Sequence, residues 1–143
     1  MEHEKKALEL FHDRCNCAQS VLAASVDEET LSRTQAFGAA ALFGGGLCRT
    51  GRTCGAVTGA LMAIGLKHGP RSSGEPERDR QALYERGQRF LAEFELSHGS
   101  LDCRELTGCD LRTPEGQARY REGLHEQLCS KLVADAARMV AEA

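Results

Sequence analysis

The sequence lacks long apolar runs, tryptophan and any strong excess of charge. Its most apolar run, residues 56–66, is far shorter than the ~20 residues that a membrane-spanning helix needs. Residues 1–14 are too polar for the apolar part of a secretory signal. The formal net charge is -3, aromatic residues make up only 5% of the chain, and no nucleic-acid-binding motif is present. These absences predict a cytoplasmic protein with no nucleic acid as partner and no membrane insertion.

Strand patterning and internal repeats are also missing, because no stretch alternates apolar and polar residues. Apolar residues recur at helical spacing instead. The length allows a core to form without obligatory disulfides or metals. We therefore predict an all-α fold, a compact bundle of about four to five helices, with residues 1–143 forming a single helical domain.

The expected helices follow from periodicity, caps and breakers. They cover residues 4–11, 16–26, 30–43, 53–67, 78–96 and 114–140, with a break at 14–15, a glycine stop at 44–46, a polar loop at 69–80 and a short helical turn within 101–111. Thr30 and Thr113 are the expected N-caps of two of them, and Pro114 suits a first helical position.

The helix that starts near Cys54 is apolar nearly all round, which predicts that it is central and buried. Gly55, Gly59 and Ala63 are spaced by four and so share one face of it. Such a stripe of small residues predicts that another backbone approaches this helix closely.

Cysteine, by contrast, is abundant. The chain has seven cysteines: Cys15, Cys17, Cys48, Cys54, Cys103, Cys109 and Cys129. A reducing compartment argues against a permanent disulfide framework, and so does the odd number. These cysteines are therefore expected to be structural, metal-binding or transiently redox-active.

Cys54 lies in the stretch "GRTCGAVTGALMAIG". If Thr53 caps the helix, the thiol lies in the first turn, where free N–H groups and the helix dipole favour the thiolate, as Arg52 would if it turned inward. A lowered pKa would make Cys54 a nucleophile, a redox centre or a metal ligand. The alternative is a small apolar filler at a tight helix crossing. Cys17 and Cys129 fall on apolar helix faces and should point inward, and Cys103 lies where two helices meet.

Several familiar sites are not expected. "CNC" at 15–17 and the intervals 48–54 and 103–109 match no zinc or iron–sulfur pattern, and no histidine pair has helical metal-site spacing. The glycine-rich stretch 43–55 lacks the phosphate-loop lysine and follows a helix instead of a strand. No Ser–His–Asp or Cys–His arrangement is evident.

Four segments together resemble the C_GCAxxG_C_C family of putative redox-active proteins. They are "NCAQSVL" at 16–22, "FGGGLCRTGRTCGAVTGALMAIGLKHG" at 43–69, "SLDCRELTG" at 100–108 and "CSKLVADAARM" at 129–139. The resemblance places the four family cysteines on Cys17, Cys54, Cys103 and Cys129, and leaves Cys15, Cys48 and Cys109 as auxiliary thiols. It implies a redox role or a cofactor held by cysteine, without defining a substrate.

Three functions stay open. In the leading one, a Cys54 thiolate attacks an unidentified oxidised partner and Cys17 or Cys103 resolves the mixed disulfide, as in a thiol-dependent oxidoreductase. In the second, Cys17, Cys54, Cys103 and Cys129 hold zinc or an iron–sulfur cluster. In the third, the cysteines are inert and the chain is a helical scaffold or homo-oligomerisation domain.

Overall fold

The computed structural model describes residues 2–69 and 74–143. In chain order its elements are α1 (Glu2–His12), α2 (Cys17–Ser25), α3 (Arg33–Ala40), η1 (Ala41–Phe43), α4 (Gly55–His68), α5 (Pro76–His98), α6 (Cys103–Thr107), α7 (Pro114–Arg119), the π-helical η2 (Tyr120–Cys129) and α8 (Ser130–Glu142). These residues include no strand, and their only bridge pairs Thr53 with Asp102. The predicted all-α class is confirmed, with short segments added to the expected bundle.

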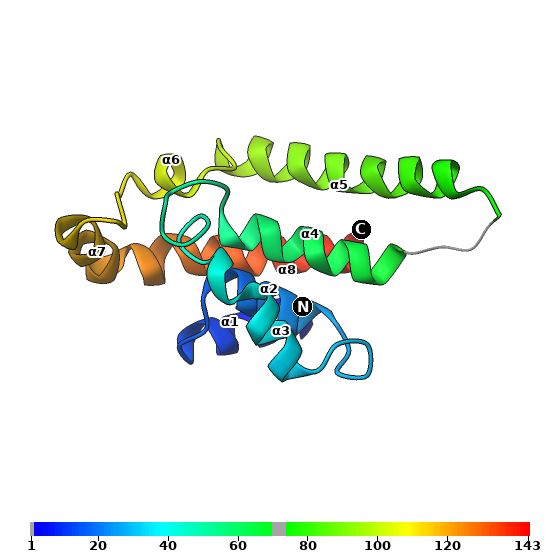
Figure 1. Ribbon diagram of the computed structural model, residues 1–143. Helices are drawn as coiled ribbons and strands as arrows, with labels where there is room; N and C mark the ends of the chain where they lie inside the picture. The colour runs from blue at the N-terminus through cyan, green and yellow to red at the C-terminus, as the bar shows by residue number, and fades with distance from the viewer. Residues whose placement is uncertain (1, 70–73) are drawn as a thin grey trace.

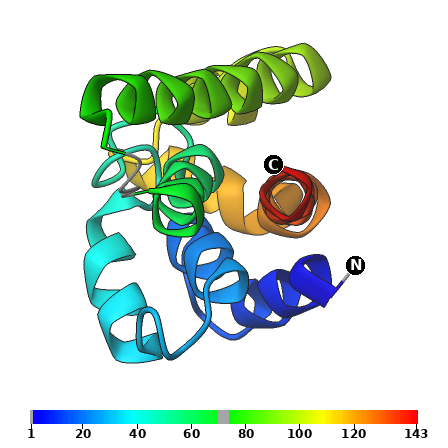
Figure 2. The ribbon, with the colours of Figure 1, turned by 90° about the vertical axis from the view of Figure 1, so that its right-hand side faces the viewer.

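Helices α4 and α8 run through the middle of the molecule, with α1, α2 and α3 on one side and α5 on the other (Figure 1 and Figure 2). Helix α2 packs against α1, α3, α4 and α8. The largest fully buried side chains of this core are Phe11, Leu22, Ile64, Phe94 and Leu132. No helix within the described ranges is both long and apolar enough to cross a membrane.

The predicted stripe of small residues on α4 is confirmed as the contact with α2. A Cβ atom added to Gly59 would lie 2.6 Å from the carbonyl oxygen of Ala18, and one on Gly55 would lie 3.1 Å from Cys17 Cβ. Ala63, on the same face, is fully buried. The two backbones therefore approach as closely as only glycine allows, and this brings the start of α2 beside the start of α4.

Some predicted helix ends were wrong. Helix α3 begins later than expected because Ser32, and not Thr30, is its N-cap. The Ser32 hydroxyl accepts from Gln35 N at 3.1 Å, and Gln35 Oε1 accepts from Ser32 N at 3.1 Å, which is a complete capping box. Helix α5 begins at Pro76, inside the predicted loop 69–80, since proline suits a first helical position. Residues 70–73 of that loop lie outside the described residues.

The predicted last helix is three segments. Its start is confirmed, because Thr113 Oγ1 accepts from Gly116 N at 3.0 Å. From Tyr120 to Cys129 the backbone is π-helical, and Gly123 leaves helical geometry there (φ 166°, ψ -25°). The chain returns to α geometry in α8, whose apolar face is buried as expected: Leu132, Val133, Ala136 and Val140. The π-helical segment ends on Cys129.

Candidate functional site

The four cysteines singled out by the resemblance come together, although they belong to four separate segments. Cys17 begins α2, Cys54 precedes α4, Cys103 begins α6 and Cys129 ends η2. Cys17 interacts electrostatically with the other three, and both Cys54 and Cys103 interact with Cys129. All four line one cavity of about 610 Å³. All seven cysteines of the chain are free thiols.

This cavity connects the core with the surface. Its lining includes the buried Cys54, Cys129 and Leu132 as well as the exposed Leu42 and Cys48. Aromatic and aliphatic side chains form much of the remaining wall: Phe11, Leu106, Leu111, Tyr120 and His125. The thiols therefore face a largely apolar hollow that opens on one side.

Cys17 is positioned by the N-cap that precedes it. Asn16 Oδ1 accepts from Gln19 N at 2.8 Å, and Gln19 Oε1 accepts from Asn16 N at 2.9 Å. The Asn16 amide also donates to the carbonyl of Ala41 at 3.1 Å, and a Cβ on Gly44 would lie 2.7 Å from Asn16 Cβ. Asn16 thus fastens the start of α2 to the glycine-rich loop. The Asn-x-x-Gln spacing of a capping box was the sequence signal for it.

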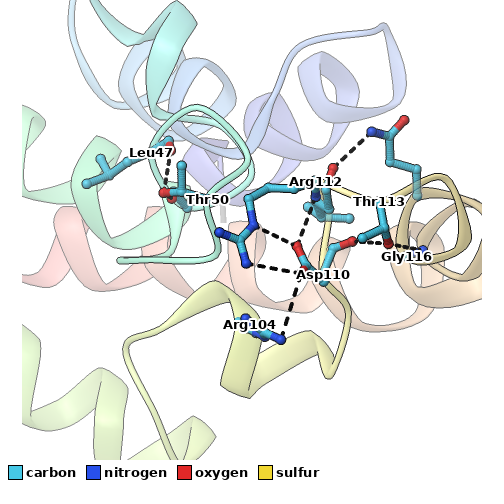
Figure 3. Close-up of polar contacts among 10 residues, drawn as sticks. Leu47, Thr50, Arg104, Asp110, Arg112, Thr113 and Gly116 are labelled. Atoms are coloured by element: carbon cyan, nitrogen blue, oxygen red, sulfur yellow. Dashed lines mark hydrogen bonds and ion pairs between the residues drawn. The ribbon is translucent and has the colours of Figure 1, made fainter.

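The glycine-rich loop makes a left-handed turn. Five consecutive residues have positive φ: Gly45 (65°), Gly46 (69°), Leu47 (62°), Cys48 (56°) and Arg49 (64°). For the residues other than glycine this conformation costs ~1–2 kcal/mol each. Thr50 Oγ1 holds the turn by donating to the carbonyl oxygens of Gly46 and Leu47, at 2.9 and 2.7 Å, and the contact with Leu47 is drawn in Figure 3. A Cβ on Gly46 would lie 2.7 Å from Cys103 Cβ, so the turn also admits the start of α6.

Cys54 and Cys103 are joined through a short antiparallel pairing of their backbones. Cys54 N–H donates to the carbonyl of Leu101 and Cys103 N–H donates to that of Arg52, both at 2.7 Å. Thr53 forms the bridge with Asp102 between them. Thr53 is therefore not the N-cap of α4, as the sequence suggested; that position belongs to Cys54 itself.

The loop after α6 is held by charged groups. Asp110 accepts two hydrogen bonds from the Arg112 guanidinium, at 3.0 and 3.1 Å, and forms an ion pair with Arg104 at 3.8 Å (Figure 3). Hydrogen bonds from Arg112 lower the pKa of Asp110 to about 2. Behind this loop Cys109 is buried beside Cys103 and Leu111, and it does not line the cavity.

The pKa expected for Cys54 was wrong in direction. Burial raises the pKa of this thiol from an ordinary 9.0 to about 12, although the backbone N–H groups of Ala56 and Val57 act in the opposite sense. The sulfur makes no capping hydrogen bond of good geometry, so the N–H groups recover only part of the lost solvation. Burial likewise raises the pKa of Cys103 to about 11.

Cys129 behaves in the opposite way. A hydrogen bond from the Cys17 thiol lowers the pKa of Cys129 below its ordinary value, and a second bond from the Tyr120 hydroxyl adds to this against the effect of burial. Because Cys17 holds its proton in that bond, the pKa of Cys17 is raised well above the ordinary value. Of these four thiols, Cys129 is the one whose surroundings favour ionisation.

Sequence reasoning missed the aromatic groups around Cys129. The Tyr120 ring meets the His125 ring edge to face, with centroids 5.6 Å apart, and His125 stacks on Phe11 at 4.0 Å. In a chain with so few aromatic residues, a tyrosine and a histidine preceding a cysteine in one helical segment were the available signal. Two auxiliary thiols, Cys15 and Cys48, also line the cavity, and burial raises the pKa of Cys15.

The predicted metal site does not fit the side chains as they are placed. Among residues 2–69 and 74–143, no three His, Cys, Asp or Glu side chains are arranged to hold a metal ion. Zinc or iron–sulfur binding by the four cysteines stays a prediction from the sequence.

One comparison with known proteins identifies a family. A protein-family model described as "Putative redox-active protein (C_GCAxxG_C_C)" matches residues 15–143, a span that contains all four cysteines. No curated protein and no solved structure matches the chain. Because the family model covers most of its length, the chain belongs to the C_GCAxxG_C_C family, which is described by redox activity.

Proposed function

We propose that this protein performs thiol–disulfide exchange, with Cys129 as the attacking thiol and Cys17 as the resolving thiol. The observation that carries the proposal is that Cys17 and Cys129 line the wall of one open cavity and that Cys17 lowers the pKa of Cys129. The attacking species in such exchange is a thiolate, and a second thiol within reach completes the reaction.

The first step forms a mixed disulfide. Cys129 sulfur attacks one sulfur of the substrate disulfide, the S–S bond breaks, and the departing thiolate takes up the proton that Cys129 gives up. Once Cys129 is bound in the mixed disulfide, the interaction with Cys129 that is the first cause of the raised Cys17 pKa is lost. In the second step Cys17 sulfur attacks Cys129 sulfur and displaces the other substrate thiol, which takes the Cys17 proton. Two electrons pass from the cysteine pair to the substrate, which leaves as two thiols. A thiol reductant would reverse the two steps and return Cys17 and Cys129 to free thiols.

In this proposal Cys54 is not the attacking thiol that the sequence analysis predicted. Its raised pKa, like that of Cys103, keeps the thiol protonated at neutral pH and slow to attack. The two instead line the cavity beside the reacting pair. Attack by Cys54 remains the rival assignment and is separated from ours by single substitutions.

The test is oxidation by one equivalent of a small disulfide, followed by thiol counting and mapping of cross-linked peptides. We expect two of the seven thiols to be lost and the new disulfide to join Cys17 with Cys129. Cys129→Ser should abolish the reaction, whereas Cys17→Ser should stop at a mixed disulfide on Cys129. Cys48→Ser removes an exposed thiol at the cavity mouth and serves as the matched control.

Three results would overturn the proposal. One is an unchanged thiol count. Another is a disulfide between Cys54 and Cys103 that still forms in the Cys129→Ser variant. The third is stoichiometric zinc or iron in protein purified without oxygen and lost from the Cys17→Ser variant, which would establish the metal site instead.

A further inference from the structure

Three arginines lie around the mouth of the cavity. Arg14 follows α1, Arg49 belongs to the left-handed turn and Arg121 lies on η2, so they come from three separate segments. All three side chains are exposed and all three line the cavity. Within the described parts of the chain no aspartate or glutamate lines it. The protein as a whole carries a net charge of -3, so this positive rim runs against the overall balance.

The guanidinium groups of these arginines are not used to hold the fold. Within residues 2–69 and 74–143, neither an ion pair nor a side-chain hydrogen bond is formed by any of the three. Other arginines do pair: Arg112 with Asp110 at 3.0 Å and Arg138 with Glu142 at 3.0 Å. Arginine is suited to bind carboxylates through two parallel hydrogen bonds. The rim therefore presents three groups able to bind an anion.

The backbone at two of the three positions is strained. Arg14 has φ 71° and Arg49 has φ 64°, in the left-handed region that residues other than glycine adopt at a cost of ~1–2 kcal/mol. Each is adjacent in sequence to a cysteine that lines the cavity, Cys15 and Cys48. Strain of this kind is concentrated at functional sites. In this protein the strained residues are two arginines that line the cavity holding the thiols.

The size of the cavity favours a small molecule over a protein disulfide. A volume of about 610 Å³ lies within the roughly 300–1,000 Å³ typical of small-molecule sites. Cys129 is only 4% exposed, so a disulfide must enter the hollow to reach it.

From these observations we infer that the substrate is a low-molecular-weight disulfide bearing carboxylate groups, bound by the arginine rim formed by Arg14, Arg49 and Arg121. The inference rests on the proposed thiol exchange and adds the class of substrate. The carboxylates bind at the rim while the sulfurs reach Cys129. One anionic disulfide and the Cys17 and Cys129 thiols give two anionic thiols and one protein disulfide, so atoms and electrons balance.

The test compares three small disulfides that differ mainly in charge: 3,3′-dithiodipropionate, bis(2-hydroxyethyl) disulfide and cystamine. For each disulfide, the rate of protein oxidation is divided by the rate at which the same disulfide reacts with 2-mercaptoethanol. Differences in intrinsic reactivity between the three disulfides then cancel. We expect the anionic probe to react about tenfold faster or more than the cationic one. The preference should shrink in 0.5 M salt, because the rim is exposed to solvent.

Arginine variants locate the effect. Replacing all three rim arginines (Arg14→Gln, Arg49→Gln and Arg121→Gln together) should abolish the preference, so that the normalised rates with the anionic and the cationic disulfide become equal. Arg78→Gln, on the exposed start of α5, is the matched control and should alter neither rate. Triple substitution to lysine keeps the charge and should retain part of the preference, which guards against a folding defect in the glutamine variant.

A non-reacting analogue separates binding from chemistry. Suberate has the length and charge of dithiodipropionate without its sulfurs, and calorimetry should show that it binds the native chain and not the triple glutamine variant. Equal normalised rates for the three disulfides would overturn the inference and leave the proposed function intact. Binding of suberate without any oxidation by the disulfides would instead overturn the proposed function, and with it the assignment of the anion as an oxidant.

Discussion

The start of α4 and the end of η2 each place a cysteine in the core, and each of these cysteines, Cys54 and Cys129, is 4% exposed. Their surroundings nevertheless shift the pKa values of the two thiols in opposite directions. Cys54 receives backbone N–H groups from the first turn of its helix, and burial still raises its pKa to about 12. Cys129 receives a thiol and a hydroxyl from Cys17 and Tyr120, and these lower its pKa despite burial. Directed side-chain donors, more than a helix N-terminus, therefore distinguish the two thiols.

The largest expected effect separates these two cysteines directly. Cys129→Ser should lower the rate of disulfide exchange by at least ~100-fold, since it removes the attacking atom. Cys54→Ser should change that rate by only a few-fold. The measurement is stopped-flow oxidation of each variant at pH 7. A reversed order of the two effects would return the attacking role to Cys54.

The next effect tests the close packing of α2 on α4, which brings Cys17 into the site. Gly59→Ala should destabilise the fold by ~1–3 kcal/mol, because the added Cβ would lie 2.6 Å from the Ala18 carbonyl oxygen. Gly65→Ala on the same helix meets nothing within 4 Å and should instead stabilise it by ~0.5–1 kcal/mol. Denaturant unfolding of both variants gives the comparison. Equal stabilities would show that the stripe is not a contact.

Stability should depend on alkaline pH. The Cys54 thiol stays protonated in the folded chain to about pH 12, whereas an unfolded thiol ionises near its ordinary value of 9.0. Its contribution is therefore fully present below pH 9 and is lost as the pH rises towards 12, at up to ~1.4 kcal/mol per pH unit. Unfolding curves from pH 8 to 11 measure this slope. Cys54→Ala should make it shallower, and an identical slope in that variant would contradict the assigned burial effect.

The smallest effect concerns the donors to Cys129. Tyr120→Phe removes one of two hydrogen bonds and should slow alkylation of Cys129 at neutral pH by ~2–10-fold, the equivalent of one ordinary hydrogen bond. The midpoint of the pH dependence of the alkylation rate should move to higher pH. Tyr84→Phe, at an exposed position on α5, is the control. No change at Cys129 would mean that the Tyr120 hydroxyl does not stabilise the thiolate.

The sequence by itself determined the features that depend on neighbours along the chain. Helical periodicity, the break at Arg14 and the cap at Thr113 each involve only a few consecutive residues, and all three were predicted. The stripe that includes Gly55 and Gly59 was also evident, because one helix face is enough to define it. The choice of four cysteines among the seven came from the family resemblance.

Only the tertiary structure decided the chemistry of the site. Cys17 comes from a distant part of the chain and reaches Cys129 only once α2 has packed against α8. The pairing of Thr53 with Asp102, which takes Thr53 away from the helix N-cap, is also long-range. The pKa of a buried thiol depends on the balance between lost solvation and the donors that reach it. That balance is set by packing across the fold. The local sequence could therefore place the cysteines on their elements, but it could not predict which thiol has the lowest pKa.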